Sequence, residues 1–265
     1  MYTVVIDEAG DVGLKDVKPD PSYGPTQYFC VCATIIDEDN RQQIEETLAA
    51  LPFFHEIVHA NRLGHFEKIL LARTISKLPV GMFGLISNKL SLLDYLPDAS
   101  KTPTHFYNKC LQYLLERVGD ALGKFGIPAS DVRIRLEARA QRCSSLLSFI
   151  ESIQKNPLDH RSVALRNIDR FSITAVKKTD DACMPISDFG AHALFTAVRR
   201  DARAFGLSEP RYLLECRDRF LAGKDGSIVG YGIKAIHTLQ DLALPADTAA
   251  FFKDLGNSQR EYWKM

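Results

Sequence analysis

The sequence lacks the features that mark several common protein classes. It has no apolar run of the roughly eighteen residues that a membrane span needs, and it opens directly on a short apolar run without a charged leader. Its formal net charge at pH 7 is +0, so no global basic field favours nucleic acid, although a local basic patch is compatible with this total. We therefore expect a soluble, cytoplasmic protein without membrane contact, and the oligomeric state stays open.

The chain also lacks cysteine patterns of functional type. Its six cysteines form no CxxC pair and no zinc-binding spacing with histidine, so we interpret them as reduced thiols. We find no internal repeat, no low-complexity tract and no linker that divides the chain. With 46% hydrophobic and 25% charged residues over 265 positions, the composition is that of an ordinary folded protein.

What is present is an alternation of strand and helix patterns. Apolar or alternating runs predict five strands, and amphipathic runs predict helices between and after them. We therefore predict an α/β fold with a mixed five-stranded sheet and flanking helices over residues 1–205, followed by a helical extension, 206–265, packed on the same domain. The first expected strand ends at Asp7, and the others are 28–36, 80–86, 132–136 and 171–176, with a further short strand at 212–216. The expected helices are 41–51, 62–78, 104–124, 144–154, 186–205, 233–243 and 247–255. Residues 88–103 are expected to form turns.

Carboxylates stand at the ends of three of these elements. Asp7 ends the first strand, Glu137 ends the fourth, and Asp188 lies in the first turn expected of the helix after Pro185. If the first and fourth strands are neighbours, the three side chains can converge. Like charges held together need a cation, and hard divalent ions such as Mg²⁺ or Mn²⁺ prefer oxygen ligands. A two-ion site of this kind cleaves phosphodiesters.

Short motifs carry a resemblance to a known family. The segments Asp7-Glu8-Ala9-Gly10-Asp11, Glu56-Ile57-Val58-His59-Ala60 and Pro185-Ile186-Ser187-Asp188-Phe189-Gly190-Ala191 occur in this order. In order and spacing the chain resembles the domain of unknown function 3800 family of the ribonuclease H-like superfamily over about residues 1–205. It departs from the family's pattern at Glu137, where the family usually has Asp, at Val58, which is an extra residue, and at Pro185, where Gln is common.

The resemblance implies a ribonuclease H-like fold with a metal-dependent nuclease site. Asp7, Glu137 and Asp188 would be the principal ligands of Mg²⁺ or Mn²⁺, and His59 would transfer a proton or orient water. The other acids of the motifs would be a further ligand, Glu8, and secondary acids, Asp11 and Glu56. The partner would be nucleic acid, with DNA or RNA undetermined.

A local basic patch could neutralise phosphates near these acids. Arg135, Arg139, Arg142 and Lys177 are the candidates for nucleic-acid contact, among further basic residues at Arg133, Lys178, Arg199 and Arg200. The ordinary alternative is a solvated strand and helix face.

Four alternatives stay open. Glu137 could pair with a neighbouring arginine, and Asp188 could simply compensate a helix dipole. Residues His55-Glu56-Ile57-Val58-His59 spell the zinc-protease motif HExxH, but Pro52 upstream and Gly64 downstream leave little room for the long helix that such a site needs. Finally, the fold could be retained in a catalytically inactive binding module, for which Glu137 in place of Asp is the best support.

Overall fold

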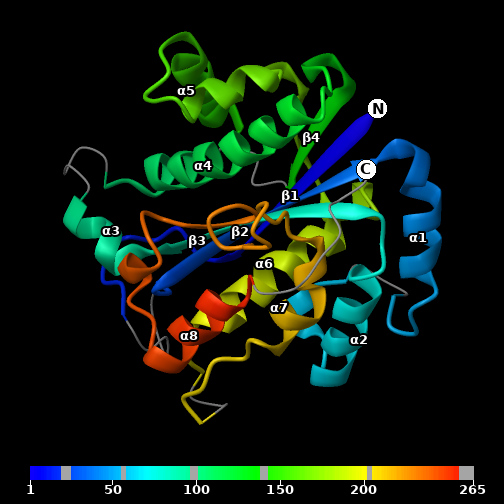
Figure 1. The fold of residues 1–265 in the computed structure, drawn as a ribbon, viewed down its shortest axis with the longest axis vertical. Coiled ribbons are helices and arrows are strands. Elements are labelled where there is room, and N and C mark those ends of the chain that lie inside the picture. The colour runs from blue at the N-terminus through cyan, green and yellow to red at the C-terminus, as the bar shows by residue number, and fades with distance from the viewer. Residues whose placement is uncertain (19–24, 55–57, 96–100, 138–142, 202–204, 257–265) are drawn as a thin grey trace.

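A six-stranded mixed sheet forms the centre of the computed structural model, which describes residues 1–18, 25–54, 58–95, 101–137, 143–201 and 205–256. The strand order is β5-β4-β1-β2-β3-β6, and β1 to β4 are labelled in Figure 1. β1 pairs antiparallel with β2 and parallel with β4. The strands are β1 (Tyr2–Gly10), β2 (Tyr28–Asp37), β3 (Val80–Asn88), β4 (Val132–Glu137), β5 (Ile173–Val176) and β6 (Ile233–Ala235).

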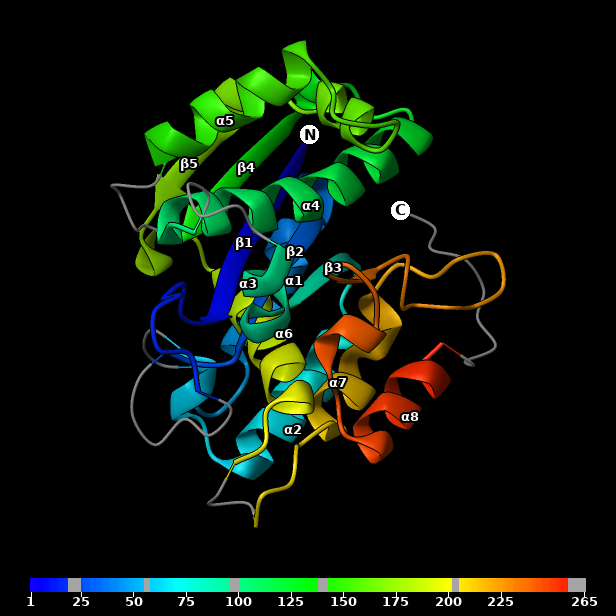
Figure 2. The same cartoon turned by 90° about the vertical axis from the view of Figure 1, so that its left-hand side faces the viewer.

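Helices cover both faces of this sheet. α4 and α5 lie on one face, and α2, α6 and α7 lie on the other (Figures 1 and 2). None of the helices among the described residues is long and apolar enough to traverse a membrane. The helices are α1 (Arg41–Ala49), α2 (His65–Ile75), α3 (Lys89–Tyr95), α4 (Pro103–Lys124), α5 (Cys143–Lys155), α6 (Met184–Val198), α7 (Arg211–Cys216) and α8 (Ala246–Asp254).

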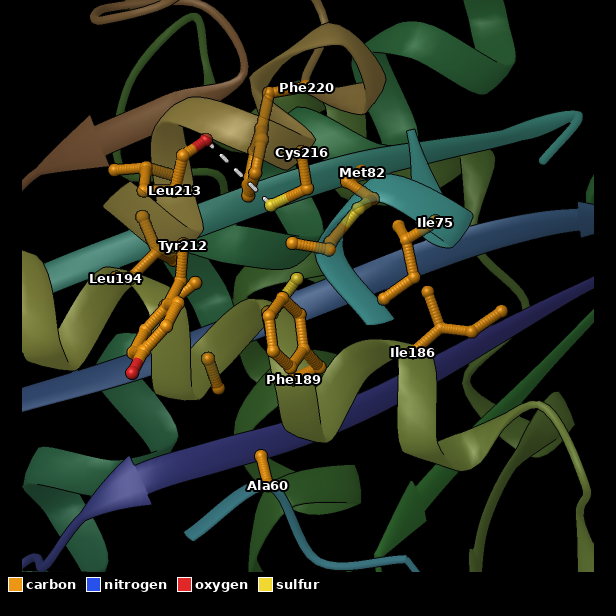
Figure 3. Close-up of a cluster of buried hydrophobic side chains, with 14 of the residues drawn as sticks. Ala60, Ile75, Met82, Ile186, Phe189, Leu194, Tyr212, Leu213, Cys216 and Phe220 are labelled. Atoms are coloured by element: carbon orange, nitrogen blue, oxygen red, sulfur yellow. Dashed lines mark hydrogen bonds between the residues drawn. The ribbon is translucent and has the colours of Figure 1, made fainter. Parts of the chain in front are cut away.

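The core is divided by the sheet into two apolar clusters. Because successive strand residues point to opposite faces, Val4 and Ile6 pack with the α4 side while Val5 packs with the α6 side. All three residues are at most 1% exposed, as expected for a strand buried on both faces. Figure 3 shows the α6 side, where Phe189 packs among side chains of β3 and α7, including Met82 and Cys216.

The C-terminal region differs most from the expected elements. The prediction of five strands is wrong because residues 233–235, expected to be helical, form the edge strand β6 and pair parallel with β3. Ile233 and Ala235 are buried with Lys234 between them, which is the alternation of a strand. Residues 212–216 are helix α7 and not a strand, since Tyr212, Leu213 and Cys216 bury one helical face.

Element boundaries also differ from the expected ones at other places. β1 does not end at Asp7 but continues to Gly10 along β2, although its pairing with β4 ends at Ile6. Residues 89–95 form α3 within the stretch expected to be turns. α4 begins at Pro103, one residue before its expected start, and Thr102 caps it, with its side chain accepting from the His105 amide. α6 begins at Met184 and ends at Val198, so it is shorter than expected at its C-terminal end.

Candidate functional site

The parallel pairing of β1 and β4 brings two of the expected acids together. Ile6 lies opposite Leu136, and the next residues along the two strands are Asp7 and Glu137. Asp7 is 1% exposed and faces the α6 side of the sheet. The adjacency of the first and fourth strands, on which convergence of the acids depended, is therefore confirmed.

The third acid reaches the same place from α6. Asp188 is the fifth residue of that helix, beyond its first turn, so the expected position in the first turn is wrong. Compensation of the helix dipole acts mainly within the first turn and therefore explains the presence of Asp188 less well. Its neighbour Ser187 is buried and donates to the Val5 carbonyl at 2.8 Å, which fixes α6 against β1. The Asp188 carboxylate also accepts from the Ala60 amide at 2.7 Å.

An ammonium group lies among these three carboxylates. Lys178 Nζ is 2.8 Å from Asp7 Oδ2, 3.5 Å from Glu137 Oε1 and 3.3 Å from Asp188 Oδ2. Its side chain is only 6% exposed. The sequence places Lys178 just after β5, the strand that pairs with β4, and this explains its proximity to Glu137. In the sequence Lys178 is one of several basic residues, and no sequence signal marks its place at the centre of the acids.

The segment that carries Lys178 is anchored by a separate ion pair. The fully buried carboxylate of Asp181 accepts from Arg135 Nη1 at 2.8 Å and from Arg41 Nη1 at 3.1 Å. Arg135, expected to contact nucleic acid, therefore already has a carboxylate partner. Lys177 is exposed. Arg139 and Arg142 lie outside the described residues.

Electrostatics make the acids of the cluster unequal. Burial, the hydrogen bond that Asp7 shares with Glu137, and the charge of Asp188 raise the pKa of Asp7 to about 8, against the opposing charge of Lys178. Burial also acts to raise the pKa of Glu137, but the hydrogen bond with Asp7 and the charge of Lys178 outweigh it and hold that pKa below its ordinary value. The pKa of Asp7 is raised because one ammonium does not balance three carboxylates, and Asp7 is the most deeply buried of the three.

His59 lies at the edge of the cluster. Its Nδ1 atom is 3.3 Å from Lys178 Nζ. Its backbone is extended, with φ −112° and ψ 121°, and precedes a short 3-10 helix, Ala60–Arg62. A zinc-protease site needs both histidines of HExxH on one helix, so the conformation of His59 does not favour that alternative. His55, Glu56 and Ile57 lie outside the described residues.

Glu8 and Asp11 point to other partners. Glu8 follows Asp7 and therefore faces the α4 side, where the Tyr107 hydroxyl donates to it at 3.4 Å. Asp11 accepts from the amides of Thr26 and Gly13 and pairs with Lys89 Nζ at 3.1 Å. Gly10 between them has φ +91°, and a side chain there would lie 2.6 Å from the Tyr28 carbonyl. The motif thus combines one acid of the cluster with a turn that needs glycine.

The cluster opens on a cavity of about 900 Å³. Asp7, Glu137, Lys178 and Asp188 lie in its wall, which also carries two further cationic side chains, Lys68 and Arg199. The wall also carries further acids, Asp11, Asp201 and Glu209, so its charge is mixed.

The carboxylate cluster has the donor chemistry that the expected divalent ion prefers. The three carboxylates supply the oxygen donors that Mg²⁺ and Mn²⁺ prefer, and their oxygens already surround one cation, the Lys178 ammonium, so the chemistry of the donor set fits. Among the described residues, however, no three His, Cys, Asp or Glu side chains are arranged to hold a metal ion as they stand. The donors fit a divalent ion, whereas their present arrangement holds an ammonium.

The chain is similar to solved structures at low sequence identity. No family model matches the chain, and no curated protein matches it. Two solved structures are similar to it, Bst-RNase HIII in complex with Mn²⁺ and a single-substitution variant of Bst-RNase HIII, with sequence identities of 14% and 15%. Each match covers 78% of this chain and 56% of the solved chain, with a TM-score of 0.44. The function of this chain must therefore follow from the chemistry of its own site.

Proposed function

We propose that this protein is a divalent-metal-dependent nuclease that hydrolyses phosphodiester bonds at the cluster of Asp7, Glu137 and Asp188. The observation that carries the proposal is the convergence of these carboxylates, from β1, β4 and α6, on one cation at the wall of a large cavity. The motif resemblance to the domain of unknown function 3800 family supports it, although no family model matches.

Each residue has a role that follows from its position. Asp7, Glu137 and Asp188 would hold Mg²⁺ or Mn²⁺, which when bound polarises the phosphoryl group and activates water. The short, buried Asp7 is fixed by the Glu8 amide at 2.7 Å, whereas Glu137 has one more methylene and is partly exposed, so it can adjust to the ion. The imidazole of His59 lies beside the cluster, where it can accept a proton or orient water.

The cavity is suited to a chain of phosphodiesters. The acids would repel phosphates, but Lys68 and Arg199 on the same wall supply compensating positive charge. Contacts of these two side chains with phosphates would be independent of base sequence.

A catalytically inactive binding module is the second candidate, and one observation favours it. Lys178 already supplies a positive charge to the carboxylates, so the cluster could be a purely structural ion-pair network. This alternative predicts nucleic-acid binding without hydrolysis and no dependence on Mg²⁺ or Mn²⁺.

A nuclease assay on the full chain tests the proposed function. Labelled single-stranded and duplex DNA, RNA and hybrid substrates would be incubated with Mg²⁺ or Mn²⁺, and with EDTA. We expect metal-dependent cleavage that falls by at least about 100-fold in Asp7→Asn. Changing a residue that only hydrogen-bonds to a metal ligand costs about 10–100-fold, and loss of a direct ligand should cost more. Asp180→Asn, at an exposed acid near Lys178, is the matched control and should retain activity. Cleavage that survives EDTA, or that is equal in Asp7→Asn, would contradict the proposal.

A further inference from the structure

We propose that Lys178 is a built-in counter-ion of the carboxylate cluster and that a divalent metal ion binds there by displacing its ammonium. This inference rests on the proposed function, and it makes metal occupancy a competition with a side chain of the same protein. No motif in the sequence assigned a role to this lysine.

Lys178 and a metal ion would compete because both would contact the same carboxylate oxygens. Lys178 Nζ contacts Asp7 Oδ2, Glu137 Oε1 and Asp188 Oδ2, one oxygen from each acid of the cluster. Its contacts of 2.8–3.5 Å are those of an ammonium, whereas Mg²⁺ needs oxygens at about 2.0–2.1 Å. A metal ion bound by these atoms would lie within a few ångströms of Nζ, and at that separation two positive charges repel strongly.

Lys178 is held in the cluster by its charge. The groups that face its Nζ are the three carboxylates and His59 Nδ1, at 3.3 Å. Burial acts to lower the pKa of Lys178, but the charges of Asp7, Asp188 and Glu137 outweigh it and raise that pKa above its ordinary value. Three carboxylate oxygens within 3.5 Å of Nζ thus hold the charged ammonium in the metal-free protein.

The side chain has space to leave. Lys178 lines the cavity of about 900 Å³, and lysine carries its charge on a flexible four-carbon stem. Its backbone can stay in place because Arg41 and Arg135 hold Asp181, three residues later. Displacement would move the ammonium from the acids toward the cavity, where a phosphodiester would lie.

Mn²⁺ affinity in the absence of substrate tests the inference. Titration of the full chain would be followed by electron paramagnetic resonance of free Mn²⁺ and by thermal unfolding, comparing the wild type, Lys178→Met and the control Lys177→Met. We expect Lys178→Met to bind Mn²⁺ at least about tenfold more tightly than the wild type and to unfold at a lower temperature without metal. Saturating Mn²⁺ should remove that difference in unfolding temperature. Lys177, adjacent and exposed, should change neither quantity.

The titration distinguishes failure of the displacement model from failure of the proposed function. If the wild type binds Mn²⁺ and Lys178→Met binds it equally or more weakly, the displacement model is wrong while the proposed function stands. If neither protein binds Mn²⁺, both are wrong. Should Lys178→Met not fold, Lys178→Gln keeps a hydrogen-bond donor toward the carboxylates without the charge, and the same gain in affinity is required of it.

Discussion

Two buried lysines lie near the carboxyl end of β1, and they meet their acids in opposite ways. Lys89, at the start of α3, pairs with Asp11, whereas Lys178 faces Asp7, Glu137 and Asp188. Their side chains are 0% and 6% exposed, so burial alone does not distinguish them. The two sites differ in the number of carboxylates for each ammonium and in the number of other hydrogen-bond donors to those carboxylates.

The Lys89 pair is fully matched. Lys89 Nζ donates to the carbonyls of Asp11 and Gly13, at 3.0 and 2.9 Å, and to the Asp11 carboxylate at 3.1 Å. The Asp11 carboxylate also accepts from the amide and hydroxyl of Thr26. Burial acts to raise the pKa of Asp11, but these hydrogen bonds and the charge of Lys89 outweigh it and lower that pKa. This pair is complete as it stands and holds a turn.

The Lys178 cluster is incompletely matched. Three carboxylates share one ammonium, and the pKa of Asp7 rises to about 8 in place of falling. A complete ion pair stabilises structure, whereas a surplus of carboxylates indicates a place for a further cation. Within one five-residue motif, Asp11 thus belongs to a complete ion pair, whereas Asp7 belongs to a cluster with a surplus of carboxylates.

The largest expected effect is on stability at the complete pair. Lys89→Met should lower the free energy of unfolding by about 2–3 kcal/mol, because it leaves the carbonyls of Asp11 and Gly13 without their donor and removes the ammonium beside the partly exposed Asp11 carboxylate. Urea unfolding measures this, and Mn²⁺ affinity should not change. Lys15→Met, at an exposed lysine, is the control, with an expected change within about 0.5 kcal/mol. A loss below about 1 kcal/mol for Lys89→Met would show that the pair is not the structural element described.

The next effect is on metal binding at the incomplete cluster. Asp188→Asn keeps an oxygen to accept from the Ala60 amide, so stability should change by less than about 1 kcal/mol. It removes one negative charge from the cluster, and Mn²⁺ affinity should fall by about 10–100-fold. Isothermal titration calorimetry measures the affinity, with Asp120→Asn on the exposed face of α4 as control. Unchanged affinity would remove Asp188 from the ligand set.

The smallest effect is the acid response of Asp11. Its folded pKa lies below the ordinary value of 3.8, so its stabilisation is fully present above pH 3.8 and is lost as pH falls through the folded pKa. The stability difference between the wild type and Asp11→Asn should therefore shrink as pH falls from about 5 to about 2. Because the Asp11 side chain is 41% exposed, we expect the change to be modest. Urea unfolding at stepped pH measures it, and a constant difference would refute the assignment.

Much of the fold could be predicted because its elements have strong local patterns. β2 and β3 are long apolar runs, β4 alternates, and α4 carries an apolar stripe, and all four lie close to their expected places. The errors fall where local patterns are short and ambiguous. A five-residue run such as 212–216 fits either period, and the packing of Tyr212 and Cys216 against the α6 side of the core decides for helix.

The candidate site shows the same division. Asp7, Glu137 and Asp188 were identified because acids at the ends of apolar elements are conspicuous in a sequence. Lys178 was not assigned to the cluster, since one lysine after a strand resembles any surface lysine. Asp11 and Glu8 stand within one motif with Asp7, but the alternation of β1 and the turn at Gly10 direct them to Lys89 and Tyr107.

The sequence by itself determined the alternation of strands and helices, the doubly buried first strand and the identity of the three converging acids, because hydrophobic period and charge are local properties of the chain. Only the tertiary structure decided that β4 lies beside β1 and that β6 joins the sheet at the edge next to β3. It also decided that, among the described residues, the cation paired with Glu137 is Lys178 and not an arginine. The physical reason is that pairing between distant segments depends on packing over the whole sheet, and the sign and number of charges in a cluster are fixed only when those segments meet.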